Sequence, residues 1–387
     1  MSTTFSNVSI VGTGQLPIVK ENPKSIREMG AEAVSLAMAD ANVSSVDAIF
    51  VGNMLGDELQ NQKHIATLIA TEAGLRGVEA SHVRAATATG AAALRMAYFS
   101  VASGEARRAI ALGIEKMSEG DATPALAKAL DAEIVVPTKA TLLSQNARIM
   151  QLYMDTYGVD ADVFNNFALN AHRNARTNPY ALFKDKEVTN QKISESRVIT
   201  PPLRLYDASP VCDGAAAVVL ARTSKARRYT DHPVRIVASN VATDWMNIDD
   251  REDPLDLYAV RRSVRGAFYK ANVREYDIDL FENHDAFTIM SCLSLEAIGF
   301  AERGKGWQLA VENEIGLNGR IPLATMGGLK ARGHPIGATA LYQTCEIVQQ
   351  LTGQAGSNQV KAARIAMLLS IGGAASTVFT HIFDYVD

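Results

Sequence analysis

The sequence predicts an α/β fold built from two copies of one unit, and three observations lead to this prediction. Short apolar runs typical of buried strands alternate with segments of helical periodicity along most of the chain. Four stretches of the first half recur in the same order in the second half. Ala, Val, Ile and Leu supply most of the apolar residues, because hydrophobic content is 47% and aromatic content only 6%. This composition favours helices packed on both faces of a mainly parallel sheet.

The internal repeat consists of four pairs of similar segments. NVSIVG at 7–12 resembles PVRIVA at 233–238, ANVSSVDAIFVGN at 41–53 resembles ANVREYDIDLFEN at 271–283, TATGAAAL at 87–94 resembles HPIGATAL at 334–341, and DGAAAVVLAR at 213–222 resembles GGAASTVFTH at 372–381. The first three pairs are 226, 230 and 247 residues apart, and the fourth is 159 residues apart. The first copy therefore carries an insertion of about 88 residues, which is 247 less 159.

Each copy is predicted to run strand, helix, strand, helix, strand. In the first copy these are a strand ending at IVGTG, a helix over 26–41, the strand DAIFVGN, a helix beginning near Thr89, and the strand 108–114. The insertion looks helical and irregular, with helices at LLSQNARIMQLYMDTYG and VFNNFALNAHRNART. We expect a first half over 1–118 plus 206–225, an inserted loop domain over 119–205, and a second half over 226–387.

The pattern also predicts where a ligand binds. In open α/β sheets, ligands bind beyond the carboxyl ends of the strands, near helix N-termini. These positions are 52–54, 84–90, 283–288, 333–337 and 370–374. If the two copies are related by a pseudo-twofold axis, the turns 87–90 and 334–337 should face each other.

Two histidines occupy such positions. His284 directly follows the strand IDLFEN, and His334 lies between a Gly-rich loop and a helix start. The free N–H groups of that helix start, and those of the second Gly-rich segment SIGGAAS at 370–376, suit a carbonyl oxygen or a developing oxyanion. For the other five histidines we expect surface or packing roles: His64, His82, His172, His232 and His381.

Composition excludes several classes of function. A net charge of −4 gives no basic surplus for nucleic acid, and no apolar stretch is long enough to span a membrane. The start of the chain shows no basic region followed by an apolar run, so no secretory signal is expected. Cys212, Cys292 and Cys345 lack metal-ligand spacing and are odd in number, which indicates buried free thiols, no metal site and a cytoplasmic setting.

Five motifs resemble those of the thiolase superfamily, and the similarity covers nearly the whole chain. They are GIEKMS at 113–118, PLRLYDASPVCDGAAAVVLA at 202–221, ENHDAFT at 282–288, GHPIGAT at 333–339, and LLSIGGAAS at 368–376. The H-D-x-F form at 284–287 is similar to the archaeal and sterol-carrier-protein-type branches. The resemblance implies a five-layered α/β/α/β/α fold, acyl-CoA substrates with no permanently bound cofactor, and a homodimer or tetramer. In the sterol-carrier-protein branch it also implies a small OB-fold partner.

The resemblance further implies roles for individual residues. His334 would be the base, His284 would orient a water or donate to the enolate oxygen, and the Gly372 backbone N–H would form a second oxyanion hole with that of residue 87. The departure is at Thr87, which stands where the family has its nucleophilic Cys. Ser370 stands where classical thiolases keep a second Cys, and Ala286 where many members of this branch place it.

Three functions follow. The first is a thiolase-type acyltransferase of lipid metabolism (acetyl-CoA acetyltransferase or 3-ketoacyl-CoA thiolase type) with Thr87 as a weak nucleophile. The second is a retro-aldolase on a β-hydroxyacyl-CoA, which needs a base and enolate stabilisation but no nucleophile. The third is a non-catalytic acyl-CoA-binding subunit beside a Cys-bearing paralogue. Residues that contact CoA are not assigned; Arg84, Lys330 and Arg332 are cations either at the mouth of the site or on a solvated surface.

Overall fold

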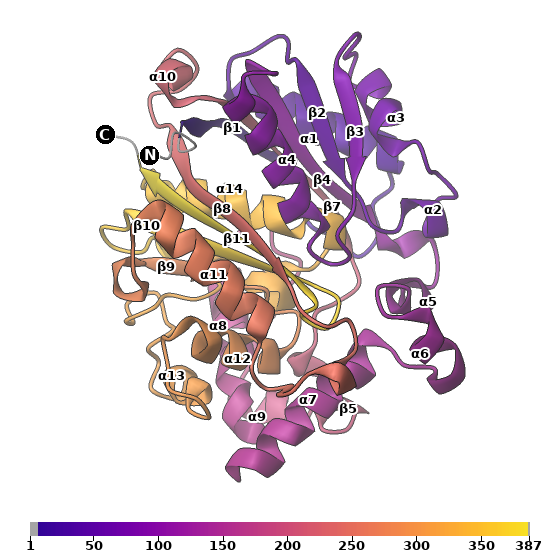
Figure 1. The fold of residues 1–387 in the computed structure, drawn as a ribbon, viewed down its shortest axis with the longest axis vertical. Helices are drawn as coiled ribbons and strands as arrows, with labels where there is room; N and C mark the ends of the chain where they lie inside the picture. Colours follow the sequence, from indigo (N-terminus) through magenta and orange to yellow (C-terminus); the bar gives the residue numbers. More distant parts are fainter. Residues whose placement is uncertain (1–6, 386–387) are drawn as a thin grey trace.

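The computed structural model describes residues 7–385, and these form one nine-stranded sheet with helices on both sides (Figure 1). In their spatial order the strands are β3 (Glu79–Val83), β2 (Ala48–Gly52), β4 (Arg108–Lys116), β7 (Asp213–Arg222), β1 (Val8–Gln15), β8 (Val234–Thr243), β11 (Thr377–Tyr385), β10 (Ile365–Gly372) and β9 (Leu280–Glu282). Equivalent strands of the two copies stand in mirror order about the centre of the sheet. From the centre outward, β1 matches β8, β7 matches β11, β4 matches β10 and β2 matches β9. The sheet is therefore two related half-sheets joined where β1 pairs with β8.

The prediction of a mainly parallel sheet is wrong, since the sheet is mixed. Strands β3, β2 and β4 are parallel, as are β9 and β10, but every pairing between β4 and β10 through the centre is antiparallel. The cause is visible in the second half, where only residues 373–376 separate β10 from β11. So short a connection makes a hairpin, and a hairpin is necessarily antiparallel.

The structure also corrects the register of the fourth repeat pair. Asp213 begins β7, but its predicted match Gly372 ends β10, and β11 begins only at Thr377. The connection between β4 and β7 spans 117–212, against 373–376 in the second half. The insertion is therefore about as long as the sequence predicted.

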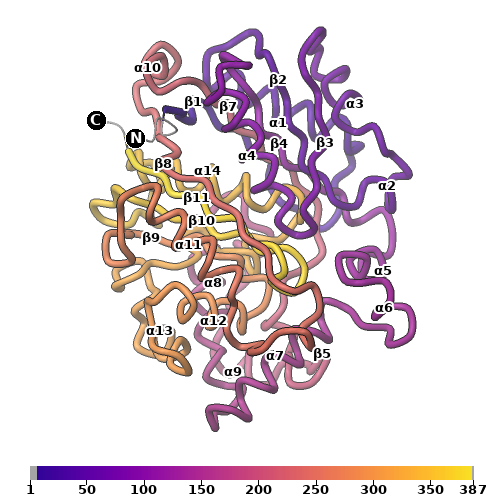
Figure 2. Tube along the Cα trace, in the orientation of Figure 1, coloured from indigo at the N-terminus to yellow at the C-terminus, as the bar shows by residue number. Residues whose placement is uncertain are grey.

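The helices complete five layers. They are α1 (Ile26–Asp40) and α3 (Ile65–Glu72) outside the first half-sheet, α4 (Thr89–Ser103) and α14 (Thr339–Leu351) between the half-sheets, and α11 (Tyr258–Ala271) and α12 (Thr288–Ile298) outside the second. The central layer is dominated by small apolar residues such as Ala91 and Ala340, which let the two inner helices approach each other closely. Figure 2 shows the two halves as separate colour blocks, indigo above and orange to yellow below.

The inserted segment covers one end of the second half. Its helices are α5 (Ala122–Ala127), α6 (Ala132–Thr138), α7 (Leu142–Tyr157), α8 (Asn165–Ala175) and α9 (Asn190–Ser194), and it also holds the short hairpin β5 (Val198–Thr200) and β6 (Leu203–Arg204). The expected helices α7 and α8 are both present, and their apolar faces share a core with α12 (Figure 1). Smaller helices are α2 (Gly56–Leu59), α10 (Thr223–Ala226) and α13 (Gly306–Val311). No helix in the described part of the chain is long and apolar enough to cross a membrane.

Candidate active site

The two symmetry-related turns meet at the N-termini of α4 and α14, as the repeat predicted. A Cβ added to Gly90 would lie 2.7 Å from the carbonyl oxygen of Gly337, and one added to Gly337 would lie 2.6 Å from that of Ile114. These are backbone contacts that leave no room for a side chain. Gly90 is thus required because the two helix starts touch, and Gly337 because its helix start also meets the carboxyl end of β4.

A buried carboxyl group joins these turns to the neighbouring strand ends. Glu115, at the end of β4, accepts hydrogen bonds from the backbone N–H groups of Met54, Leu55 and Gly337, each at 3.0 Å, and from Asn53 Nδ2 at 2.7 Å. Burial raises the pKa of Glu115 to about 7, and the backbone N–H donors oppose that rise. The sequence motif contained Glu115, but nothing local indicated this bridging role.

A cavity of about 130 Å³ lies beside the meeting point. Thr87, His284 and His334 all line it, so the structure brings together three predicted site residues from three separate segments. The inserted segment contributes apolar lining from α5 and α7, including Leu126, Leu142 and Leu143. The lining also includes Phe287 and Ile336, which fall in the predicted ranges 283–288 and 333–337, and Ser209 and Met290, which lie outside the predicted ranges.

His334 is held as a neutral imidazole with one nitrogen occupied. Its Nδ1 lies 2.6 Å from Thr339 Oγ1, and that hydroxyl in turn donates to the carbonyl oxygen of Pro335 at 3.2 Å. The Thr339 hydroxyl has one proton, so in the tautomer in which it donates to Pro335, Nδ1–H of His334 is the donor and Nε2 keeps its lone pair. Burial lowers the pKa of His334 well below the ordinary value of 6.5, and electrostatic interactions with His284 and with the Arg332 cation lower it further. The residue is therefore suited to accept a proton.

His284 packs against His334 edge to face. The ring centroids are 5.1 Å apart and the planes lie at 86°. Burial lowers the pKa of His284 to about 4, although the adjacent Asp285 carboxylate acts in the opposite direction. Its buried Nδ1 has no hydrogen-bond partner in the protein. Two neutral imidazoles thus face one cavity.

Thr87 is not paired with the base. Its hydroxyl donates to the carbonyl oxygen of Ile371 at 2.6 Å, so its proton points toward the Gly-rich turn rather than toward His334. The residue before it, Ala86, has a φ of +49°, a left-handed conformation that non-glycine residues seldom adopt. Such strain is found where a turn must hold one side chain in a fixed position.

The remaining predicted residues lie close to the cavity but do not line it. Gly372 ends β10 against the turn before α4, where an added Cβ would be 2.7 Å from the carbonyl oxygen of Ala85. Its neighbour Gly373 lines the cavity. Ser370 is fully buried within β10, and its hydroxyl has no partner. Ser370 therefore lies within the sheet and does not reach the cavity surface.

The cations and thiols near the site have structural surroundings. The prediction of mouth or surface cations is wrong for Lys330 and Arg332, because only 2% and 0% of their surface is exposed. Arg84 is exposed and pairs with Asp57. All three cysteines are buried free thiols, as predicted; Cys212 accepts a hydrogen bond from the His334 backbone N–H at 3.2 Å, and burial raises its pKa to about 12. Across residues 7–385, no group of three or more His, Cys, Asp or Glu side chains could hold a metal ion.

Sequence similarity to known proteins extends over nearly the whole chain. A family model described as "Thiolase, N-terminal domain" matches residues 8–224, and one described as "Thiolase C-terminal domain-like" matches 240–385. The chain is 40% identical over 381 residues to "Acetyl-CoA acetyltransferase" of Methanothermobacter thermautotrophicus, covering 98% of this chain and 99% of that one. It is 31% identical over 396 residues to "Sterol carrier protein 2" of Homo sapiens, covering 96% of this chain and 71% of that one.

Solved structures share the fold. One titled "Ltp2-ChsH2(DUF35) aldolase" has a TM-score of 0.86 at 22% identity, with 98% of both chains covered. Another, titled "Crystal structure of human mitochondrial 3-ketoacyl-CoA thiolase in complex with CoA", has a TM-score of 0.78 at 16% identity, with 99% of both chains covered. At these identities the likeness concerns the five-layered architecture alone.

Proposed function

The chain belongs to the thiolase family, and from that premise we propose that this enzyme makes or breaks the carbon–carbon bond next to the thioester of an acyl-CoA. The observation that carries the proposal is the pair of neutral imidazoles, His284 and His334, at the wall of one cavity. A neutral imidazole can take a proton from a substrate carbon or hydroxyl. N–H donors beside it can hold the enolate oxygen that develops on the thioester.

The acyl-transfer form of this reaction requires Thr87 to attack the thioester. His334 would take the hydroxyl proton, and the backbone N–H groups of Gly372 and Thr87 would hold the oxyanion. Ser370 is a weaker candidate for a catalytic role, because it is fully buried and does not line the cavity. A hydroxyl ionises far less readily than a thiol. The Thr87 proton must also leave the Ile371 carbonyl oxygen before it reaches His334. Acyl transfer through Thr87 is therefore expected to be slow.

The hydrogen bond from Thr87 to Ile371 favours a second candidate, retro-aldol cleavage of a β-hydroxyacyl-CoA. In that reaction His334 takes the proton of the β-hydroxyl group, the adjacent carbon–carbon bond breaks, and its electron pair forms the enolate of the shortened acyl-CoA. The proton that His334 has taken is then transferred to the enolate carbon, which gives the shortened acyl-CoA. The other product is an aldehyde or ketone. No nucleophile is consumed. The solved aldolase with a TM-score of 0.86 has the same fold.

One experiment separates these reactions. The protein and its Thr87→Ala variant are incubated with acetyl-CoA or acetoacetyl-CoA, and the intact masses are measured. Acyl transfer predicts an added acyl group on the wild type and none on the variant. The aldolase predicts no added mass, turnover of a β-hydroxyacyl-CoA by both proteins, and loss of that turnover in His334→Ala. If neither substrate class is turned over while acyl-CoA still binds, the chain is a non-catalytic subunit and the proposal fails.

We also propose that the chain works as a homodimer or tetramer in the cytoplasm. In the order of the described strands, β3 lies at the end of the sheet, so one of its edges has no neighbour within the chain. On α4, Met96 and Phe99 are 42% and 38% exposed. Analytical ultracentrifugation of the purified chain should give a dimer mass or a multiple of it, and a monomer at micromolar concentration would refute this. Co-purification would identify a small OB-fold partner or a Cys-bearing paralogue.

A further inference from the structure

Behind the two histidines lies a cluster of five buried ionisable side chains that the proposed reaction does not use. It contains three carboxyl groups, Glu282, Asp285 and Glu346, and two cations, Lys330 and Arg332. No member is more than 2% exposed. An isolated charge in such a place is very unfavourable, so each ionised group needs a partner.

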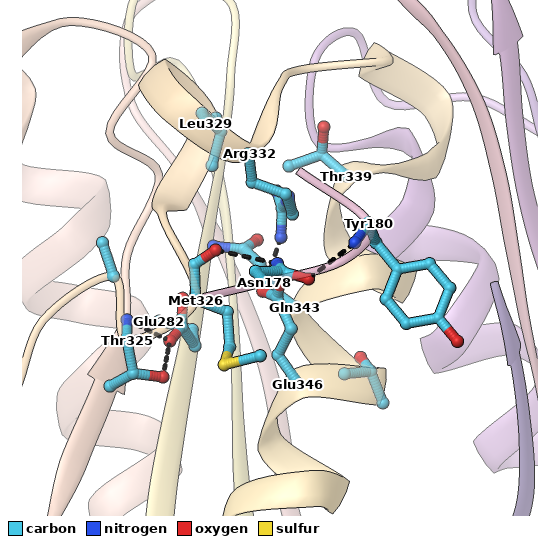
Figure 3. Close-up of polar contacts among 12 residues, drawn as sticks. Asn178, Tyr180, Glu282, Thr325, Met326, Leu329, Arg332, Thr339, Gln343 and Glu346 are labelled. Carbon is cyan, nitrogen blue, oxygen red and sulfur yellow. Dashed lines mark hydrogen bonds and ion pairs between the residues drawn. The ribbon is translucent and has the colours of Figure 1, made fainter. Parts of the chain in front are cut away.

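Each of the two cations already forms an ion pair with one of the carboxylates. Lys330 Nζ lies 3.0 Å from Asp285 Oδ2, and Arg332 Nη1 lies 2.6 Å from Glu346 Oε2. Figure 3 shows Arg332 directed at Glu346 on α14, with Glu282 and Thr325 to the side. Glu282 is therefore the one carboxyl group of this cluster without a counter-ion.

Only one of the two carboxyl oxygens of Glu282 is hydrogen-bonded. Its Oε1 accepts from both the backbone N–H of Thr325, at 2.8 Å, and the Thr325 hydroxyl, at 2.7 Å. Its Oε2 is buried and has no partner. Two amide oxygens of the same interior, Asn283 Oδ1 and Gln343 Oε1, also lack a donor, while Gln343 Nε2 donates to the Asn283 carbonyl oxygen. Three acceptor oxygens of this interior therefore lack a donor, whereas the cluster has one buried donor without an acceptor, Arg332 Nε.

We propose that Glu282 is a neutral acid that carries a proton on Oε2, supplies the missing donor, and leaves the cluster without net charge. The proton reaches an amide oxygen directly or through a buried water. Burial raises the pKa of Glu282, and the charge of Glu346 raises it further. An ionised Glu282 would leave this buried cluster with a net negative charge, which burial strongly disfavours. Glu282 is thus a buried acid that contributes a hydrogen bond and no charge to the cluster.

The test compares two identical changes within the cluster. Glu282→Gln preserves the shape of a neutral acid and puts an N–H where the O–H stood. Glu346→Gln leaves Arg332 buried without its counter-ion. We expect the Glu282 variant to unfold at the same or a higher denaturant concentration than the wild type, and the Glu346 variant at a clearly lower one. Equal destabilisation of the two variants would overturn the proposal.

An infrared difference spectrum reads the protonation state directly. Subtracting Glu282→Gln from the wild type at pH 7 should reveal the C=O band of a carboxylic acid, and the bands of a carboxylate in its place would overturn the assignment. Because the folded state keeps a proton that the unfolded state has lost, wild-type stability relative to the variant should fall as pH rises from about 4.5 through the raised pKa. The unfolding and infrared measurements need no substrate, so their outcome does not depend on the proposed function. Only the kinetic measurement rests on that function. In that readout, kcat/KM of the Glu282 variant at pH 7 should stay within about threefold of wild type.

Discussion

Glu115→Gln tests whether one carboxylate holds the two helix starts of the site in place. Glu115 Oε1 accepts from the Leu55 N–H and from Asn53 Nδ2, and Oε2 accepts from the N–H groups of Met54 and Gly337. A glutamine has one oxygen and one NH2 group. In either orientation of the amide, its NH2 group therefore faces two N–H donors that have lost their acceptor.

The magnitude follows from the milder orientation. If NH2 replaces Oε1, Asn53 Nδ2 still donates to the Ile114 carbonyl oxygen at 3.1 Å, but the Leu55 N–H is left without an acceptor. A buried unpaired donor costs about 1–3 kcal/mol, and one further hydrogen bond is lost at about 1 kcal/mol. We therefore expect a loss of about 2–4 kcal/mol in the free energy of unfolding.

Urea unfolding followed by far-ultraviolet circular dichroism measures this loss. The matched control is Glu32→Gln, which changes the same residue type at an ion pair with Lys24 in which both side chains are exposed. It should cost less than about 1 kcal/mol, as surface pairs do. If the two variants differ by less than about 0.5 kcal/mol, Glu115 does not hold the turns together and the reasoning is refuted.

Three further changes probe the same region. Thr87→Cys should accelerate acylation by acetyl-CoA in the intact-mass assay, because a thiol ionises far more readily than a hydroxyl; no acylated protein would show that the turn cannot present a nucleophile to His334. For the wild type, kcat/KM should stay level as pH falls to below 6.5, since burial lowers the pKa of His334, whereas an acid limb centred at 6.5 or above would contradict a desolvated base. Gly90→Ala should lower the free energy of unfolding by about 1–3 kcal/mol, because its Cβ meets the Gly337 carbonyl oxygen, while Gly120→Ala, which meets only the flexible tip of Leu59, should be nearly neutral.

The sequence by itself determined the duplicated α/β architecture and predicted the segments that line the candidate site. Alternating strand and helix periodicity depends on local residues, and the repeat showed that the segments at Thr87 and His334 must be equivalent. The strand directions were not determined, because an apolar strand such as β11 reads the same in a parallel or an antiparallel pairing. Only the short connection over 373–376 decided that this strand returns antiparallel to β10.

The chemistry of the site required the tertiary structure. The Thr87 hydroxyl is directed by a carbonyl group 284 residues away, and no local pattern contains that contact. Lys330 and Arg332 read as surface or mouth cations because their own segment shows no carboxylate, while the structure supplies Asp285 and Glu346 from other segments. Whether a charged or polar group is exposed or buried depends on which distant side chain meets it, because only a partner offsets the loss of water. That information is present only in the folded chain.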